Sequence, residues 1–332
     1  MERSARREWL APFAVDVAGV LSVHRRGYGD PALRTDAAGA IWRACRTPDG
    51  PATVQVTARI GAATPAWREG SGGSYPSGPT LVDATAWGAG AGWLLDALPA
   101  LLGADDRPED FVPGHPVLRA AARRHPAVRI GRSGLVMEAL VPAVLEQKVV
   151  GMEATRAWRM LLWRFGEPAP GPCPPGPHPP GPHPPGLRVP PDAATWASIP
   201  SWEWHRAGVE AVRARVIAAA ARVAAKLEEV TTMGSDEADR RLRAIPGVGP
   251  WTSAEVRQRA CGDADALSVG DYHLPSIVGW ALAGRPVDDA EMLELLAPYP
   301  GHRHRASILA GLAGAGPARR GPRMAVRDYR AF

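Results

Sequence analysis

The chain has 332 residues, with 39 lysines and arginines against 34 aspartates and glutamates, and a formal net charge of +5. This length leaves room for two or three domains with substantial cores, and the basic balance favours a polyanionic partner without identifying it. The three cysteines, Cys45, Cys173 and Cys261, lie far apart without a CxxC pair, which argues against a disulfide framework and a structural zinc site.

Residues 1–112 are predicted to form a mixed α/β domain. Segments 15–24, 40–46 and 53–60 have strand-like composition, and 53–57 alternates polar and apolar residues as a half-buried strand does. Segment 85–102 is predicted to be helical. The amino terminus lacks a long apolar core with a cleavage site, and no run reaches membrane-spanning length, so we expect a cytoplasmic protein.

Residues 113–332 are predicted to be helical apart from one stretch. Segment 135–150 places apolar residues broadly on one face and ends in Glu146-Gln147-Lys148-Val149. Segment 167–192 is so rich in proline and glycine that it excludes a helix or a central strand. We expect it to be an exposed, polyproline-like spacer, with His178 and His183 in a solvated linker rather than at a metal site.

A glycine-rich turn joins two helices within residues 236–261. Pro246-Gly247-Val248-Gly249 follows one predicted helix, and Pro250-Trp251 opens the next, which should run to about residue 261. Free backbone N–H groups at such a turn favour an anion, and a nucleic-acid phosphate fits. A plain helix–turn–helix connection is the alternative.

Asp271 follows this second helix after a loop and a short apolar run. The hairpin with its spaced aspartate resembles the helix-hairpin-helix DNA glycosylase superfamily, and is most similar to bacterial 3-methyladenine-DNA glycosylase II. Residues 27–31 and 42–43 resemble the amino-terminal domain of the same type. The resemblance implies an α+β fold, with an N-terminal antiparallel sheet and helices followed by an all-helical glycosylase core.

The resemblance also implies a reaction, the hydrolysis of the N-glycosidic bond of alkylated purines after base flipping. Asp271 would be the catalytic carboxylate that stabilises an oxocarbenium-like state and orients water. Trp251 stands where bifunctional relatives carry a lysine nucleophile, so the enzyme is expected to be monofunctional. The alternatives are a helix cap for Asp271 and ordinary core packing for Trp251.

The DNA contacts implied by the resemblance come from three parts of the chain. The amides of Gly247 and Gly249 would anchor a phosphate. Gln147 and Lys148 belong to the segment that lies at the minor groove in the superfamily, although an exposed helix end is the alternative. Arg303, at the start of a predicted helix, completes the expected contacts with double-stranded DNA containing damaged bases.

The hairpin is also expected to carry a monovalent cation. By position, the backbone carbonyls of Arg243, Ile245 and Val248 would bind Na⁺ or K⁺. No other cofactor is expected to be required, and without a four-cysteine set we expect no iron–sulfur cluster. The resemblance implies a bacterial monomer that works at the nucleoid and has no contact with a membrane.

The base pocket departs from the superfamily pattern. Trp251 and Glu255 are the predicted pocket residues, but Glu255 replaces a tyrosine and Gly311 stands in place of a tryptophan. Gly270 replaces a second acid directly before Asp271. The pocket is therefore less aromatic, which leaves the lesion spectrum open. Two rivals remain: a glycosylase with lyase activity on other damaged bases, and a non-catalytic DNA-binding protein, against which Asp271 argues.

Overall fold

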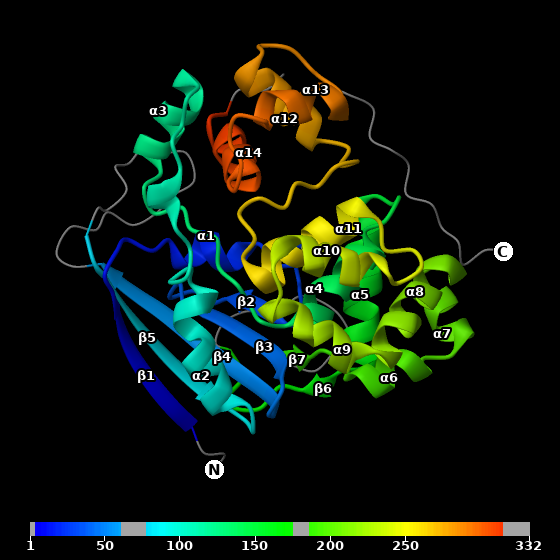
Figure 1. Ribbon diagram of the computed structural model, residues 1–332. Coiled ribbons are helices and arrows are strands. Elements are labelled where there is room, and N and C mark those ends of the chain that lie inside the picture. The colour runs from blue at the N-terminus through cyan, green and yellow to red at the C-terminus, as the bar shows by residue number, and fades with distance from the viewer. Residues whose placement is uncertain (1–3, 61–77, 175–185, 315–332) are drawn as a thin grey trace.

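A five-stranded antiparallel sheet forms the N-terminal part of the computed structural model, which describes residues 4–60, 78–174 and 186–314 (Figure 1). The strands in sheet order are β1 (Ser4–Ala11), β5 (Thr80–Trp87), β4 (Gly50–Ile60), β3 (Ile41–Thr47) and β2 (Leu33–Thr35). One face of β5 is buried against helix α2 (Ala91–Leu101), whose Leu94 and Leu98 share its core. The predicted sheet with flanking helices is confirmed.

Two predictions in this part were wrong in detail. Segment 15–24 contains helix α1 (Val17–Ser22), which starts because the Asp16 side chain accepts a hydrogen bond from the Gly19 amide at 2.9 Å. Segment 85–102 is not helical throughout: it contains the end of β5, then a sharp turn, and then α2. Gly88 in that turn has φ of +97°, and a Cβ there would lie 2.4 Å from the Pro51 carbonyl oxygen.

The helical part has two cores. The larger one contains α4 (Val136–Leu145), α5 (Gly151–Phe165), α6 (Ala193–Ser198), α7 (Ser201–Arg206), α8 (Ala211–Arg222), α9 (Ala224–Glu228), the 3-10 turn η2 (Glu229–Thr232), α10 (Ser235–Arg243) and α11 (Pro250–Val256). Its indoles Trp158, Trp196 and Trp204 stack in a row. None of the described helices combines the length and the apolar character needed to cross a membrane.

The second helical core brings together elements from distant parts of the chain. It consists of α3 (Pro116–Arg124), α12 (Leu274–Leu282), α13 (Asp289–Leu296) and α14 (Arg303–Leu312), together with Phe111, which follows the 3-10 turn η1 (Pro108–Asp110). Figure 1 shows this group above the sheet and the larger helical core. Thus α3 packs with the last helices of the described chain rather than with α4, which follows it.

The described ends of the proline-rich stretch 167–192 are attached to the rest of the protein, which differs from the exposed spacer that its composition predicted. Its ends pair as two short strands, β6 (Glu167–Pro168) and β7 (Arg188–Val189). Leu187 and Val189 are buried against Trp42 of the sheet. The residues between prolines keep N–H groups, and the Ala169 amide donates to the Leu187 carbonyl at 3.0 Å. His178 and His183 lie outside the described residues.

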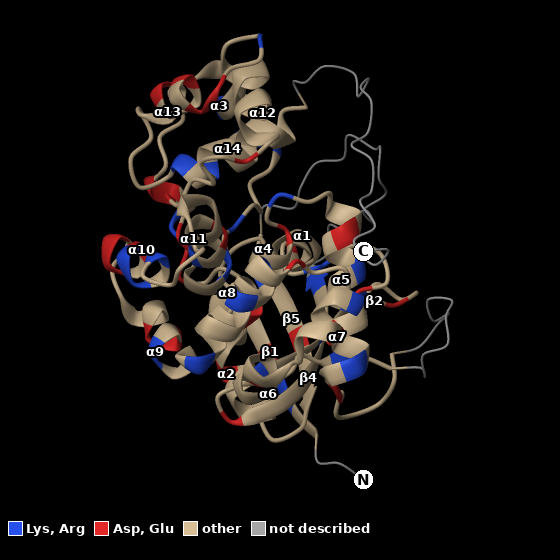
Figure 2. Ribbon diagram, turned by 90° about the vertical axis from the view of Figure 1, so that its right-hand side faces the viewer, with Lys and Arg blue, Asp and Glu red and all other residues tan. Residues whose placement is uncertain are grey.

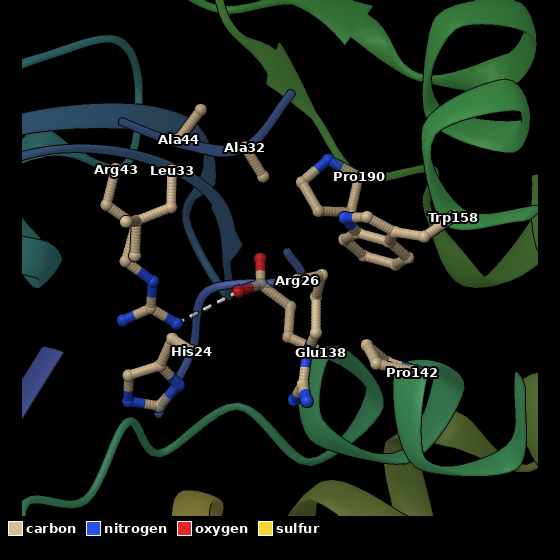
Figure 3. Close-up of a pocket in the computed structure, with 10 residues that line it drawn as sticks. All are labelled: His24, Arg26, Ala32, Leu33, Arg43, Ala44, Glu138, Pro142, Trp158 and Pro190. Atoms are coloured by element: carbon tan, nitrogen blue, oxygen red, sulfur yellow. Dashed lines mark hydrogen bonds and ion pairs between the residues drawn. The ribbon is translucent and has the colours of Figure 1, made fainter. Parts of the chain in front are cut away.

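A polar seam joins the sheet to α4 (Figure 3). Arg43 of β3 donates to Glu138 of α4 at 3.0 Å, and the Arg46 amide donates to the same carboxylate at 2.6 Å. Burial raises the pKa of Glu138, while Arg43 opposes that shift. The adjoining pocket, of about 20 Å³, suits a single water molecule rather than a substrate.

This seam gives a stability prediction. Glu138→Ala leaves Arg43 uncompensated at 4% exposure, so the free energy of unfolding should fall by about 3–5 kcal/mol. Urea denaturation measures the change. The matched control is Asp96→Ala, because the Asp96 side chain is 88% exposed in its pair with Arg7 and its loss should cost at most about 1 kcal/mol. Equal losses in the two variants would contradict the assignment.

Candidate active site

The hairpin between α10 and α11 has the predicted form. Acids occupy the first turn of α10 and arginines its last turn, which complements the helix dipole (Figure 2). Gly247 has φ of +92°, and a Cβ there would lie 2.3 Å from Val216 Cγ2, so the turn needs glycine at this position. Gly249 differs, because its φ of −96° suits any residue and the space beside it is open.

The hairpin presents unused hydrogen-bond donors. Within the part of the chain that the structure describes, the backbone N–H groups of Gly247 and Gly249 reach no acceptor. Pro250 begins α11 directly afterwards, so these donors lie at the positive end of that helix. Such donors suit a phosphate oxygen, and phosphate binding at Gly247 and Gly249 stays a prediction.

The loop between α4 and α5 is attached to this hairpin. Gln147 Nε2 donates to the Gly247 carbonyl at 3.0 Å and to Thr252 Oγ1 at 2.8 Å. Lys148 follows at φ of +55°, the one described non-glycine residue with a positive φ, and its side chain is exposed. Gln147 therefore holds the loop in place, and Lys148 occupies its strained tip.

The three carbonyls predicted to bind a cation belong to the same hairpin. The Ile245 carbonyl accepts the Val248 amide at 3.0 Å and keeps a second lone pair. Arg243 ends α10, so its carbonyl lies near the same turn. These groups are chemically suited to a monovalent cation. Among the described residues, no group of three or more His, Cys, Asp or Glu is arranged to hold a metal ion.

Asp271 precedes α12 and is held from two sides. Its Oδ1 accepts the backbone N–H groups of His273 at 2.8 Å and Leu274 at 2.9 Å. His273 is the N-cap residue of α12, so Asp271 caps the start of the helix from two residues before that position. Asp271 Oδ2 accepts Trp251 Nε1 at 3.2 Å. One carboxylate oxygen is thus bound at the start of α12, and the other is oriented by the Trp251 indole. The same residue can serve both as a cap and in catalysis.

Asp271 borders a pocket of about 200 Å³ between the two helical cores. The other lining residues come from α11 and the π-helical turn η3 (Arg257–Cys261), from the following loop, from α12 and from α14: they are Glu255, Gln258, Ser268, Leu274, Ile277, His304, Ser307 and Ile308. A cavity of about 150 Å³ accommodates benzene, so this pocket can take a flat heteroaromatic base.

The two predicted base-pocket residues lie in different places relative to this pocket. Glu255 lines the pocket, whereas Trp251 is not among the lining residues and instead positions Asp271. Sequence reasoning missed Gln258, Ser268 and His304. A signal existed for Gln258, which lies three residues after Glu255 and so shares its side of the helix.

Arg303 is engaged within the protein. Its backbone N–H donates to Asp265 Oδ1 at 3.0 Å, its Nε donates to the same oxygen at 2.9 Å, and its guanidinium pairs with that carboxylate. This pair ties the start of α14 to the loop that leads to Asp271. A contact with DNA stays a prediction for Arg303, but its charge is already matched by Asp265.

His304 is a neutral group in the pocket. Burial is the largest cause that lowers its pKa to about 3; the positive charges of Arg259 and Arg305 act in the same direction, and Asp263 opposes them. Its imidazole makes no hydrogen bond to any described residue. At neutral pH it therefore offers one N–H donor and one nitrogen acceptor to whatever enters the pocket.

Solved structures with the same fold include several DNA glycosylases. The 3-methyladenine DNA-glycosylase from Archaeoglobus fulgidus has 16% identity and a TM-score of 0.67, over 92% of this chain and 97% of that one. MBOgg1 in complex with a low affinity DNA ligand has 15% identity and a TM-score of 0.65, over 95% and 96%. The apo 8-oxoguanine glycosylase/lyase from Clostridium acetobutylicum has 10% identity and a TM-score of 0.62, over 94% and 98%.

These matches confirm the predicted glycosylase fold across nearly the whole chain. No protein-family model and no curated protein sequence matches it. The fold is common to structures named for 3-methyladenine and for 8-oxoguanine, so it does not choose between these lesions.

The low pKa of His304 predicts a pH effect on stability. An unfolded histidine titrates near about pH 6.5, so between that pH and about pH 3 the unfolded chain binds a proton that the native chain does not. Above about pH 6.5, His304 therefore does not lower the free energy of unfolding. As the pH falls from about 6.5 towards 3, protonation of the unfolded chain lowers the free energy of unfolding progressively. Between pH 7 and pH 5, the free energy of unfolding should therefore fall by about 2 kcal/mol less in His304→Asn than in the wild type.

Urea denaturation at each pH tests this, with His205→Asn as the control. His205 lies exposed on α7, so its replacement should leave the pH profile of the wild type unchanged. A His304→Asn profile parallel to that of the wild type would contradict the prediction.

Proposed function

We propose that the chain is a DNA glycosylase that hydrolyses the N-glycosidic bond of alkylated purines, of the 3-methyladenine and 7-methylguanine type, in double-stranded DNA. One observation carries the proposal: the Asp271 carboxylate is fixed at the edge of a pocket that can hold a base, beside a hairpin with free amides. The shared fold with solved DNA glycosylases supports it.

In this proposal, the hairpin and the pocket bind different parts of a flipped nucleotide. The Gly247 and Gly249 amides hold a backbone phosphate, and the damaged base leaves the stack to enter the pocket. Unstacking costs a few kcal/mol and is easiest for a damaged base. Lys148, exposed at the loop that Gln147 ties to the hairpin, fills the gap in the duplex or contacts a phosphate.

Asp271 acts on the sugar. As the bond between C1′ and the base nitrogen breaks, its electron pair goes to the base, and the sugar becomes an oxocarbenium-like cation that the carboxylate stabilises. The oxygen of a water molecule then bonds to C1′, and its proton passes to Asp271. A ring-alkylated purine is cationic before cleavage and departs as a neutral base, so it requires no acid to protonate it.

The chain is monofunctional in this proposal. A lyase needs an amine that forms a Schiff base, but Trp251 has an indole N–H that already donates to Asp271. The two lysines of the chain are Lys148 and Lys226. Lys226 lies in α9, outside the pocket lining. Lys148 is exposed at the tip of its loop, where we expect it to contact DNA rather than to attack C1′.

The hairpin carbonyls complete the proposed DNA site. Those of Arg243, Ile245 and Val248 would hold a Na⁺ or K⁺ ion, whose charge would support a phosphate at the adjacent amides. No further cofactor takes part in the reaction, because water is the nucleophile and Asp271 supplies the negative charge. The chain would act on DNA as a monomer.

Asp271→Asn tests the catalytic assignment. The amide oxygen can still cap α12, but the negative charge is gone, so single-turnover release of 7-methylguanine should fall at least about 100-fold. Binding to a duplex with an abasic site should change by less than about threefold. The control is Asp288→Asn, because Asp288 caps α13 through the Glu291 amide and does not line the pocket. Undiminished base release by Asp271→Asn would sink the assignment.

Borohydride trapping tests the monofunctional assignment. The wild type should leave an intact abasic site and form no covalent protein–DNA adduct, because no amine is placed to attack C1′. Lys148→Ala should slow base flipping, seen with a fluorescent base analogue, without changing the product. An adduct in the wild type that disappears in Lys148→Ala would show lyase chemistry and overturn the assignment.

A further inference from the structure

The pocket beside Asp271 is lined by two carboxylates and by no lysine or arginine. We propose that Glu255 is the residue that selects the substrate, because its carboxylate captures bases that carry a positive charge. This inference rests on the proposed glycosylase function. It adds a recognition role that is separate from the chemistry assigned to Asp271.

A chain of hydrogen bonds holds Glu255 toward the pocket. Ser268 Oγ donates its single proton to Glu255 Oε1 at 2.6 Å, so its hydrogen bond with Gln258 Nε2 at 2.9 Å must be one that it accepts. Gln258 Nε2 also donates to the Ala266 carbonyl at 2.8 Å. A carbonyl accepts only, so the Gln258 amide has one orientation, and its Oε1 keeps no partner among the described residues.

Glu255 forms an ion pair with Arg259. Arg259 Nη1 donates to Glu255 Oε2 at 2.8 Å, while its Nε donates to the Val23 carbonyl at 3.0 Å, at the end of α1. Glu255 lines the pocket and Arg259 does not. Of the two partners, only Glu255 therefore contributes to the pocket wall. Glu255 is 9% exposed, so little water screens its charge.

The remaining polar groups of the pocket wall carry no positive charge of their own. Burial and nearby arginines lower the pKa of His304, so the imidazole adds no positive charge at neutral pH. The Ser307 hydroxyl donates to the His304 carbonyl at 2.7 Å and presents its oxygen as an acceptor. Together with the free Gln258 Oε1, these groups match a base edge that is rich in N–H donors and positive charge.

Glu255 and Asp271 should affect different steps. A ring-alkylated purine is cationic when it enters the pocket and becomes neutral as the glycosidic bond breaks. Attraction to Glu255 is therefore greater for the bound substrate than for the transition state. Interactions of that kind improve capture without raising the rate of the chemical step. Removing the charge of Glu255 should therefore raise the half-saturating enzyme concentration, whereas removing the charge of Asp271 should lower the saturating rate of base release.

Glu255→Gln tests the inference, since it removes the charge and leaves an oxygen to accept from Ser268. Single-turnover base release is measured against enzyme concentration on duplexes that differ in one base, cationic 7-methylguanine or neutral hypoxanthine. The half-saturating concentration should rise at least about tenfold for 7-methylguanine, with no fall in the saturating rate. For hypoxanthine it should change by less than about twofold.

A second variant tests the same inference in case Glu255→Gln, at a buried position, does not fold. Ile277 lines the pocket and is 36% exposed, so a lysine there adds positive charge at small risk to the core. Ile277→Lys should weaken capture of 7-methylguanine relative to hypoxanthine, and Ile277→Gln is the uncharged control. Binding of each variant to a duplex with an abasic site corrects for the effect of the new charge on DNA affinity.

The outcomes separate the two proposals. If the wild type releases neither base, the proposed function fails. If the wild type releases base but Glu255→Gln changes both substrates equally, the function stands and the role of Glu255 is overturned. A fall in the saturating rate on both substrates would also overturn it, because that result places Glu255 in the chemical step.

Discussion

The hydrogen bond between Trp251 and Asp271 joins the two halves of the candidate site. Trp251 belongs to the hairpin of the larger helical core, whereas Asp271 lies just before α12 of the second core. Because the other carboxylate oxygen caps α12, the orientation of Asp271 is determined by both cores. The pocket, the hairpin donors and the carboxylate therefore keep their mutual geometry only while these cores stay docked.

Further contacts maintain that docking. Arg303 pairs with Asp265, and the Arg305 amide donates to the Ala264 carbonyl at 3.1 Å, so α14 is attached to the loop that precedes Asp271. On the opposite side, Glu138 connects buried α4 to the sheet. The sheet contributes no residue to the pocket, and its role is to support the helices that do.

The sequence alone determined the features that depend on neighbouring residues. The hairpin needs a left-handed residue at Gly247 and a helix start at Pro250, and both are local properties of the chain. Helix α12 (Leu274–Leu282) also has a local origin, because its apolar residues and the Asp271 carboxylate that accepts its first amide lie within one segment. The short reach of capping and of glycine torsions made Asp271 and the hairpin visible before any packing was known.

Only the tertiary structure decided which side chains meet. Trp251 was expected in the pocket wall, but it supports Asp271 instead, and His304 reaches the pocket from a helix far along the chain. The buried Val189 shows the same limit, since its proline-rich surroundings indicate an exposed spacer until the sheet is placed beside them. Local composition restricts backbone conformation, whereas burial, charge pairing and pocket lining depend on surfaces that folding brings together from distant segments.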